Sequence, residues 1–547
     1  MKHLKIVLLT AALAAGAAFA QEALKSVEEE YYDFLALCGI VERPTLNYRT
    51  LSDSKWQIPE GTEHPWQGNN LGAKRVLHQS ENGAPDNFFT RGIEQSVALK
   101  IYGPEWYNSF NTEYADGWYD GALWQGRGYN TSLTGGARLE AYGFEVTFKP
   151  QVSFSQNLDF DIMDSEYGDG YGYFWGTVDA PQRFGDEAFW TFDWGDTEIR
   201  YTWHNLTAGF GTQAIWLGPA RVNPVLLSNN AATFPKVDFG LRKTSVYVPH
   251  FGWHLGQIEA RVFTGRLTES DYFDDDDSND HNMIHGLSLS YAPSFIPGLT
   301  LGANRICLVK WDWENLKYVV PQSENTYVGD DTGKGEDQKM SITVDLFFPQ
   351  VGFEVYGELG IDDYTGSVIY MGHTYVYTVG ARKAIRISKK HNLHGELIFE
   401  WNNTEMSQDY QFYSAYSFGM HYQITQGYTN RGQWLGSGIG YGGVSRYWGF
   451  KLYHSKGNIM LFIQHTNYDN NYIYSKAIKT DKDHTDDDVW YKGSKILGGS
   501  ATFFIKNLVT TAGFMWDEIR NPLYQTDEEK TTWNRNWLLF CTLKYNF

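Results

Sequence analysis

Short runs of alternating apolar and polar residues recur along most of the chain. The clearest are Phe144 to Phe148, Gly256 to Phe263, Ser341 to Phe347, Phe353 to Leu359, Leu393 to Trp401 and Ile459 to His465. Successive side chains of a strand point to opposite faces, so a period of two predicts half-apolar β-strands. The stretches between these runs are rich in residues that favour turns. The pattern therefore predicts an all-β protein.

The C-terminal segment, Trp537 to Phe547, shows the alternation most plainly. One face carries Trp537, Leu539, Cys541, Leu543, Tyr545 and Phe547, and the other carries Leu538, Phe540, Thr542, Lys544 and Asn546. In an outer-membrane barrel the apolar face of such a strand meets lipid. An aromatic last residue resembles the terminal signal of bacterial outer-membrane barrels, so we expect the barrel-assembly machinery to recognise Phe547.

The length and composition of the chain fit a barrel of medium to large size. The chain has 547 residues and is rich in Gly (55), Tyr (37), Phe (33) and Trp (20). About 450 residues beyond the N-terminal region, at roughly 10 per strand plus unequal loops, accommodate about 16 to 20 strands. No run of about 18 apolar residues follows the N-terminus, so no transmembrane helix is expected. We predict a transmembrane antiparallel β-barrel, with a soluble β protein as the alternative.

Charged, turn-rich stretches separate several of the predicted strands. They are Asp274 to Asp280, Val328 to Gln338 and Thr480 to Asp488. They fit the long extracellular loops of a barrel. The first also offers clustered oxygen ligands for Ca²⁺, but it lacks the Asp-x-Asp-x-Asp-Gly spacing of an EF-hand. A solvated loop is the favoured interpretation.

The N-terminus has the pattern of a secretory signal peptide. Lys2 and Lys5 precede an apolar core from Ile6 to Phe19, and Ala18-Phe19-Ala20 forms a small-x-small cleavage site. We expect residues 1–20 to be removed before Gln21, and the mature chain to reach the bacterial outer membrane.

Ser26 to Ile40 differs from the rest of the chain in its periodicity. Val27, Tyr31, Phe34, Leu35 and Cys38 recur at spacings of three and four, which predicts an amphipathic helix. Ser26 and Glu29 form a capping box, and Gly39 is a plausible stop. We assign residues 21–75 to an N-terminal helical, periplasmic segment and residues 76–547 to the barrel. The helix either narrows the periplasmic mouth or serves only as a handle outside it.

Charge and cysteine content exclude several classes of function. The chain has 45 basic and 65 acidic residues, a formal net charge of −20, which argues against a nucleic-acid partner. Cys38, Cys307 and Cys541 are too few and too scattered for a disulfide framework, and no zinc-ligand spacing occurs. We expect no metal and no cofactor. No GxSxG, HExxH or phosphate-cradling glycine loop is present.

Three passages resemble the Wzi-type capsule-assembly family of outer-membrane barrels. They are Trp216 to Arg242 (WLGPARVNPVLLSNNAATFPKVDFGLR), Val355 to Asp363 (VYGELGIDD) and Arg431 to Gly440 (RGQWLGSGIG). In the first, the matching positions are Trp216, Gly218, Pro219, Leu226, Leu227, Ser228, Asn229, Asn230, Ala231, Pro235, Leu241 and Arg242. Where the family has Gly-Pro-Gly, this chain has Gly-Pro-Ala.

The resemblance implies an eighteen-stranded barrel, closed toward the periplasm by N-terminal helical structure. It also implies a lectin-like function, in which the barrel holds capsular or other exopolysaccharide at the cell surface without covalent chemistry. The partners expected are outer-membrane lipid and the polysaccharide, and the chain is expected to be a monomer.

The candidate polysaccharide-binding or lumen residues come from these passages. They are Trp216, Ser228, Asn229, Asn230, Arg242, Tyr356, Glu358, Asp362, Asp363, Arg431 and Trp434. A sugar ring stacks on an indole face through its apolar C–H groups, and hydroxyl and amide groups bind sugar hydroxyls. Alternatively, Gly218-Pro219 sets a turn and Asn229-Asn230 caps a bend inside the lumen.

The acidic candidates raise the question of whether the protein is an enzyme. Glu358, Asp362 and Asp363 supply the residue type that a glycosidase pairs across its bond, yet acidic pairs are common on barrel loops. Arg242 and Arg431, if they face inward, can pair with such carboxylates or with an acidic polymer. We favour a non-enzymatic polysaccharide-binding barrel; the alternatives are a porin for small solutes and, less favoured, an outer-membrane hydrolase.

Overall fold

The computed structural model of the protein describes most of the chain. The described residues are 19–69, 71–80, 93–173, 175–274, 276–277, 279–322, 335–362, 374–406, 417–480 and 491–547. Most of the predicted signal peptide, Asp363, and most of the stretches 328–338 and 480–488 lie outside them. The expectations for those segments stay predictions.

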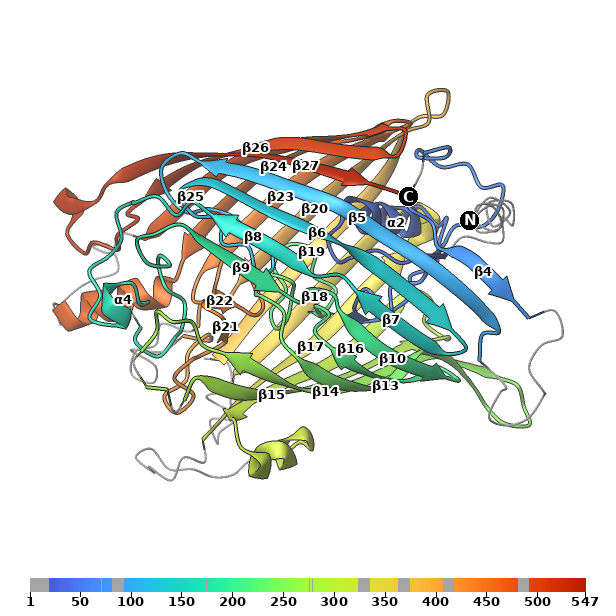
Figure 1. The fold of residues 1–547 in the computed structure, drawn as a ribbon, viewed down its shortest axis with the longest axis horizontal. Helices are drawn as coiled ribbons and strands as arrows, with labels where there is room; N and C mark the ends of the chain where they lie inside the picture. The colour runs from blue at the N-terminus through green and yellow to red at the C-terminus, as the bar shows by residue number, and fades with distance from the viewer. Residues whose placement is uncertain are drawn as a thin grey trace, which may run out of the picture.

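One closed antiparallel sheet forms the wall (Figure 1). Its strands are β5 (Ser96–Asn111), β6 (Gly128–Ala141), β7 (Phe144–Phe148), β8 (Gln151–Ser155), β9 (Phe189–Asp193), β10 (Glu198–Trp203), β11 (Leu206–Gly211), β13 (Lys236–Tyr247), β14 (His254–Thr268), β15 (His281–Pro293), β16 (Leu299–Lys310), β17 (Glu336–Phe348), β18 (Phe353–Asp362), β19 (Tyr375–Ser388), β20 (Leu393–Asn403), β23 (Val444–His454), β24 (Gly457–Tyr468), β25 (Lys492–Ile505), β26 (Leu508–Arg520) and β27 (Trp533–Tyr545). β4 (Arg75–Gln79) extends the sheet beside the start of β5.

The wall is a barrel of eighteen strands in the part of the chain that the structure describes. β7 with β8, and β9 with β10, are the two halves of one strand each, because β6 pairs with both β7 and β8, and β9 and β10 continue one another beside them. The last strand, β27, pairs with β5 and closes the sheet. The predicted fold class is confirmed. Each of the six alternating runs named first lies within a wall strand, and the C-terminal run lies in β27 as far as Tyr545.

The outer face of the wall is apolar, as expected of a surface that meets lipid. Half-exposed residues include Leu133, Phe239, Leu289, Ile342, Leu461 and Leu539. Exposed aromatic residues gather near the short-turn end at Tyr247, Phe251, Trp253 and Phe295. An apolar band with aromatic side chains at its rim is typical of outer-membrane barrels.

Glycine residues inside the barrel make room for aromatic rings on neighbouring strands. The directly opposed pairs are Phe263 with Gly286, Tyr356 with Gly380, Phe462 with Gly498, and Phe540 with Gly513. A Cβ built at any of these glycines would lie between 2.0 and 2.4 Å from the opposing ring. Close approach of this kind is a common reason for glycine within a strand.

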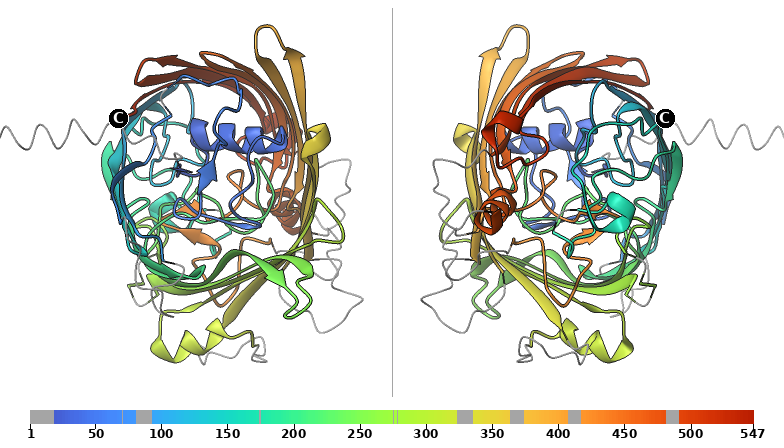
Figure 2. Two further views of the ribbon diagram at one scale, coloured as in Figure 1. Left: turned by 90° about the vertical axis from the view of Figure 1, so that its right-hand side faces the viewer. Right: turned by 90° about the vertical axis from the view of Figure 1, so that its left-hand side faces the viewer.

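The N-terminal helix lies inside the barrel at the short-turn end (Figure 2). α2 (Val27–Leu37) begins at Ser26, whose hydroxyl accepts a bond from the Glu29 N–H at 3.2 Å. It ends at Gly39, which has a φ of +74°, and the Ile40 N–H donates to the Leu35 carbonyl. The predicted Ser26 cap and Gly39 stop are confirmed. The Glu29 half of the predicted capping box is wrong, because the Ser26 N–H donates to the Ala23 carbonyl at 3.2 Å and the Glu29 carboxylate lies 3.7 Å from Arg49. The helix is buried on its polar side as well, because the lumen surrounds it.

The rest of the N-terminal segment fills the lumen beside α2. It contributes β2 (Tyr48–Arg49) and β3 (Trp56–Gln57), which pair with β12 (Trp216–Leu217) and β1 (Phe19–Ala20). We call residues 21–69 the plug. Among the described residues, no helix combines the length and the apolar character needed to cross a membrane.

Two long connections fold into the barrel from the opposite end. They are residues 212–235 and the described residues 417–443, which include β21 (Thr429–Asn430) and β22 (Gln433–Trp434). Their apolar side chains form the largest core cluster, with Leu226, Tyr428 and Tyr441 packed against wall residues such as Ile284 and Ile306. The core of the protein therefore lies inside the lumen, and the plug lies between it and the short-turn end.

Gly380→Ala tests the ring-over-glycine packing. The new Cβ would lie 2.3 Å from the ring of Tyr356, which is buried and bonded to Glu400 at 2.8 Å. We expect the free energy of unfolding to fall by about 1–3 kcal/mol, as for overpacked cores. Urea unfolding of the protein in lipid vesicles measures it. Gly357→Ala is the matched control, because the nearest atom to its Cβ lies at 3.6 Å; equal losses would contradict the explanation.

Candidate functional site

Backbone hydrogen bonds to a wall glutamate hold the plug against the barrel. Glu259 of β14 accepts bonds from the N–H groups of Leu46, Asn47 and Tyr48 at 2.9, 3.0 and 2.8 Å. Glu259 is almost fully buried. A carboxylate that accepts several N–H bonds fixes the backbone that donates them. The plug is therefore positioned by its main chain as well as by its side chains.

A cluster of two carboxylates and three arginines joins the plug, the connection 212–235 and the wall. We call residues 212–235 the folded-in loop. Asp33 of α2 lies 2.8, 3.2 and 2.6 Å from Arg43, Arg221 and Arg382. Glu354 of β18 contacts the same three guanidinium groups at 2.8, 3.1 and 2.8 Å. Burial alone would raise the pKa of Asp33, but the three arginines outweigh it and hold the pKa well below its usual range. Asp33 is therefore ionised at neutral pH.

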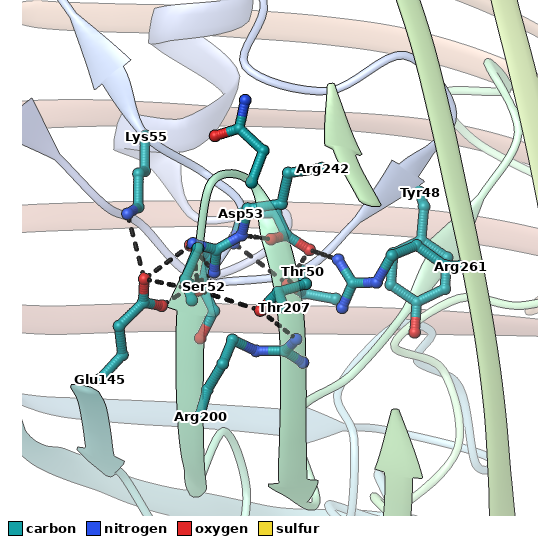
Figure 3. Close-up of polar contacts among 12 residues, drawn as sticks. Tyr48, Thr50, Ser52, Asp53, Lys55, Glu145, Arg200, Thr207, Arg242 and Arg261 are labelled. Carbon is teal, nitrogen blue, oxygen red and sulfur yellow. Dashed lines mark hydrogen bonds and ion pairs between the residues drawn. The ribbon is translucent and has the colours of Figure 1, made fainter. Parts of the chain in front are cut away.

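A second network surrounds Asp53 at the base of the plug (Figure 3). Asp53 contacts Arg242 at 2.6 Å and Arg261 at 2.5 Å. Arg242 also contacts Glu145 at 2.7 Å, and Lys55 of the plug reaches the same Glu145 at 3.1 Å. Burial opposes ionisation of Asp53, but the neighbouring arginines outweigh it, so its pKa lies below the usual range. Arg242 faces inward and pairs with carboxylates, and those carboxylates belong to the plug and to β7.

Trp216 lies deep in the lumen rather than on an open surface. Its side chain has 0% exposure, and its Nε1 donates to the Ala220 carbonyl at 3.0 Å. Lys25 and Arg49 of the plug lie 5.4 and 5.0 Å from the ring centre, and the Tyr119 ring lies at 5.6 Å. No face of the indole is left open to a sugar. The geometry fits the alternative interpretation, in which this passage forms a turn inside the lumen.

Two acidic residues of the second passage, Glu358 and Asp362, are buried inside the barrel. Glu358 is 2% exposed, and its Oε2 accepts a bond from the Val225 N–H at 3.1 Å. A Cβ at Gly218 would lie 2.9 Å from that oxygen, so the Gly-Pro turn packs directly on the carboxylate. Asp362 is 1% exposed and pairs with Lys339 at 2.7 Å. Neither carboxylate is open to a saccharide, as a glycosidase pair would have to be.

A second wall glutamate shapes the same loop. Glu400 of β20 accepts bonds from the N–H groups of Arg221, Val222 and Asn223 at 2.7, 3.0 and 2.5 Å, and from the Tyr356 hydroxyl at 2.8 Å. The Tyr356 hydroxyl therefore positions Glu400, which supports the loop, and does not bind a ligand. Glu400 therefore fixes the backbone of the folded-in loop in the same way that Glu259 of the wall fixes the backbone of the plug.

The first and third passages meet at the outer side of the core. The bonds are Ser228 Oγ to the Gly436 carbonyl (2.6 Å), Asn229 Nδ2 to the Tyr119 carbonyl (3.1 Å), the Tyr119 N–H to Asn230 Oδ1 (3.0 Å), and Asn230 Nδ2 to the Trp434 carbonyl (3.0 Å). These side chains bind backbone groups, so they fix the positions of Tyr119 and Trp434. The structure thus brings four candidate residues together, and two of them, Asn230 and Trp434, line a cavity.

That cavity opens at the long-loop end and has a volume of about 890 Å³. Its aromatic lining residues are Tyr114, Trp118, Tyr119, Trp124, Phe160, Tyr173, Trp434, Tyr441, Tyr468, Tyr524 and Trp533. Trp434 is half-buried, and Tyr441 and Tyr173 meet its ring edge to face at 5.4 and 5.9 Å. Asn230, Gln125, Gln182 and Gln433 add amide groups. The cavity combines apolar ring faces with polar donors and acceptors.

The lining of the cavity is acidic. Its charged residues are Glu113, Asp116, Asp120, Asp159, Asp161, Asp469 and Asp517 against Arg127, Lys492 and Arg535. Burial raises the pKa of Asp120 to about 7 and the pKa of Asp469 to about 6, although hydrogen bonds from Gln125 and from Tyr173 and Trp175 oppose the shifts. The pKa of Asp116 also lies above its usual range because of burial and the charge of Asp517. The cavity gains negative charge as the pH rises through neutrality.

The remaining candidates lie apart from this cavity or outside the described residues. Arg431 has a half-exposed side chain, 3.9 Å from Asp193, and a φ of +50°. Asp363 lies outside the described residues. Within the described part of the chain, no group of three or more His, Cys, Asp or Glu side chains could hold a metal ion. Two members of the Asp274 to Asp280 run are not described, so calcium binding there stays a prediction without a test.

A family model for the capsule assembly protein Wzi matches residues 111–532. The chain belongs to the Wzi family. The match covers all three passages that carry the resemblance, so that recognition is confirmed. Among curated proteins, no match was found.

One solved structure, with a TM-score above 0.5, supports the fold of this Wzi-family protein. The Wzi structure from Escherichia coli, a carbohydrate-binding β-barrel involved in group 1 capsule assembly, is 11% identical, with a TM-score of 0.52. The alignment covers 81% of this chain and 85% of that one. OccK2 of Pseudomonas aeruginosa (10% identity, TM-score 0.37, 82% and 97% covered) and OccAB1 of Acinetobacter baumannii (10%, 0.37, 85% and 99%) also match.

Family, closed barrel and apolar belt together place the protein in the outer membrane. The predicted localisation is confirmed. The end of the barrel with the short turns and the plug is then the periplasmic end, and the end with the cavity faces the cell surface.

Most of the residues that line the cavity were not predicted from the sequence. Trp118, Trp124, Asp116 and Asp120 lie in one loop, residues 112–127, in which aromatic and acidic residues alternate with glycine. That composition is the signal that could have found them. The ion pairs between the plug and the wall were not predicted either. An inward-facing arginine of a strand looks, in the sequence, like any other polar residue of an alternating run.

Asp53→Asn tests the role of the ion pairs in holding the plug. The change leaves the buried guanidinium groups of Arg242 and Arg261 without a shared carboxylate. Breaking a buried pair in this way costs about 3–5 kcal/mol of unfolding free energy. In planar bilayers we expect the wild-type protein to be nearly silent and the variant to open in bursts. Glu60→Gln, at an exposed position of the plug, is the control; equal conductance in the two variants would contradict the anchoring role.

Proposed function

We propose that this protein binds capsular or other exopolysaccharide non-covalently at the cell surface, in the cavity at the long-loop end. The observation that carries the proposal is the lining of that cavity, in which aromatic rings stand beside amides and carboxylates. Ring faces stack on the C–H faces of sugars, and the polar groups bind hydroxyls. The Wzi protein of Escherichia coli is a carbohydrate-binding β-barrel, which supports the same class of ligand.

The proposed mechanism is multivalent binding without catalysis. A polymer offers the same unit many times, so weak contacts within one cavity and across neighbouring protein molecules add up to useful avidity. The candidate glycosidase carboxylates Glu358 and Asp362 support the loop and the wall, where a polymer does not reach them. Holding the chain, rather than cleaving it, is the activity that this arrangement supports.

A porin for small solutes is the second candidate function. A further cavity of about 890 Å³ lies at the periplasmic end, lined by residues such as Val41, Lys243 and Phe347. The plug and the core of folded-in loops lie between the two cavities, and their central residues are fully buried. Conduction would need the plug to move, so the porin function ranks below polysaccharide binding.

We also propose that the chain acts as a monomer in outer-membrane lipid, and we expect no nucleic-acid partner because of its net charge of −20. Phe547 is exposed after the last strand, with the Tyr545 ring 4.9 Å away, and is the residue that the barrel-assembly machinery is expected to bind.

Trp434→Ala tests the cavity as the saccharide site. Losing one stacking ring removes about 1 kcal/mol of binding free energy, roughly a fivefold loss of affinity for the polysaccharide. Trp434→Phe should restore most of it, because an aromatic face remains. Glycan-array binding followed by titration of the best ligand measures the effect. Trp190→Ala, on the lipid-facing side of β9, is the control; unchanged binding by Trp434→Ala would remove this ring from the site.

The acidic lining predicts which polymers bind best. Neutral glucans and glucosamine oligomers should bind more tightly than a polyuronate, because like charges in a partly buried site repel. Raising the pH from 5 to 8 ionises Asp469 and Asp120, whose pKa values lie at about 6 and 7. Polyuronate binding should then weaken, glucosamine binding should strengthen while its amine stays charged, and glucan binding should stay constant. Affinity measured over this pH range by calorimetry decides it; tighter polyuronate binding at pH 8 would contradict the prediction.

A further inference from the structure

One connection between wall strands lies outside the barrel instead of above or inside it. Residues 311–320, which follow β16, include the 3₁₀-helix η2 (Trp313–Val319). Figure 2 shows this yellow-green coil beyond the ring of strands, and Figure 1 shows it below the wall near the cell-surface end. We call residues 311–320 the outer arm.

The side chains beneath the outer arm point away from the lumen. On β15, Ile284 belongs to the lumen core and Ser288 accepts a bond from plug residue Asn47, so the alternate residues Met283 and His285 face outward. On β16, Asn304 binds the same Asn47, so Cys307 faces outward as well. An outward position on a barrel wall is normally exposed, yet all three of these side chains are at most 1% exposed.

The outer arm covers these positions through specific contacts. Tyr318 packs with Met283, Cys307 and Val309 in a separate buried cluster. His285 bonds the Asn315 carbonyl at 3.1 Å, and the outward-facing Arg305 donates to the Tyr318 carbonyl at 2.9 Å. The arm is therefore docked on the outside of the wall by one buried ring and by two hydrogen bonds to its backbone.

The side of the arm that faces away from the wall is apolar and open. Trp313 is 77% exposed, Val320 67%, Leu316 44% and Trp311 41%. Large exposed side chains gathered on a small docked element mark an interaction surface. Its charged residues, Asp312, Glu314 and Lys317, are exposed too, which suits a boundary between lipid and water rather than a hydrocarbon interior.

The arm continues the lipid-facing belt of the barrel. Arg305, which lies under the arm, pairs directly with Met340 on β17. Met340 is half-exposed on the outer face, and Ile342 and Val344 follow it down the same strand. The exposed face of the arm is therefore next to the upper edge of the belt, at the level where tryptophan favours the membrane interface.

We propose that the outer arm is a lipid anchor that inserts Trp311, Trp313, Leu316 and Val320 into the outer leaflet of the membrane. The partner of this surface is outer-leaflet lipid, at the level where the acyl chains meet the headgroups. Anchoring on one side of the barrel sets the depth and the tilt of the protein, and with them the direction in which the cell-surface cavity opens. The anchor does not depend on what the cavity binds.

Tryptophan quenching by brominated lipid tests the anchor. The full-length protein is reconstituted into phosphatidylcholine vesicles with plain or brominated acyl chains, and the emission lost on Trp313→Phe gives the signal of that residue. Trp190→Phe is the control for lipid contact, because Trp190 is 70% exposed on the outer face of β9. Trp434→Phe is the control for a ring enclosed in the lumen.

We expect brominated chains to quench the Trp313 emission as strongly as the Trp190 emission, and to leave the Trp434 emission unchanged. Trp311→Phe should show the same direction with a smaller change, because Trp311 is less exposed and lies 5.5 Å from the Arg266 guanidinium. Trp313 emission that is quenched no more than that of Trp434 would overturn the anchor. The exposed face of the arm would then lie in water, where its partner would be a protein or a saccharide instead of lipid.

Discussion

Charge pairing between the plug and the inward face of the wall is the interaction on which the rest of the structure depends. A barrel of eighteen strands encloses more space than its own side chains fill. Arginines such as Arg261 and Arg382 point into that space, and each is buried once the plug is in place. A buried guanidinium is tolerated only beside a carboxylate; the wall supplies Asp238 and Glu354, and the plug adds Asp53 and Asp33. The plug therefore completes the charge pairing that the wall begins.

The plug in turn supports the loops that build the cavity. Trp216 rests on Lys25 and Arg49 of the plug, and Arg221 joins the Asp33 cluster. From this base the chain runs to Ser228 and Asn230, which hold the backbone beside Trp434. The passages that identify the family are thus largely internal supports. The side chains that face the cavity come mostly from other loops.

The fold could be predicted from the sequence, because strand alternation is a local property. The run Phe144 to Phe148 has the same bounds as β7, and Ser26 and Gly39 set the ends of α2 through their own backbone neighbourhoods. The site could not be predicted in the same way. Trp216 is far from Arg49 in the chain and close to it only after the barrel has closed, so nothing local distinguishes a buried indole from an open one. The same holds for Asp53, whose partners come from strands distant in the sequence.

The last residues of the chain bear on the order of events during assembly. Glu28, in the first turn of α2, finds its partners at Lys544 (2.9 Å) and Asn546 (3.2 Å), and Glu22 also lies 3.8 Å from Lys544. Lys544 lies on β27 and Asn546 directly follows it, so both take their places in the lumen only when β27 has paired with β5. Asp33 and Asp53 bind strands β13, β14 and β19, but the contacts of Glu28 and Glu22 need the closing strand. The start of α2 is therefore fixed in the same event that completes the wall.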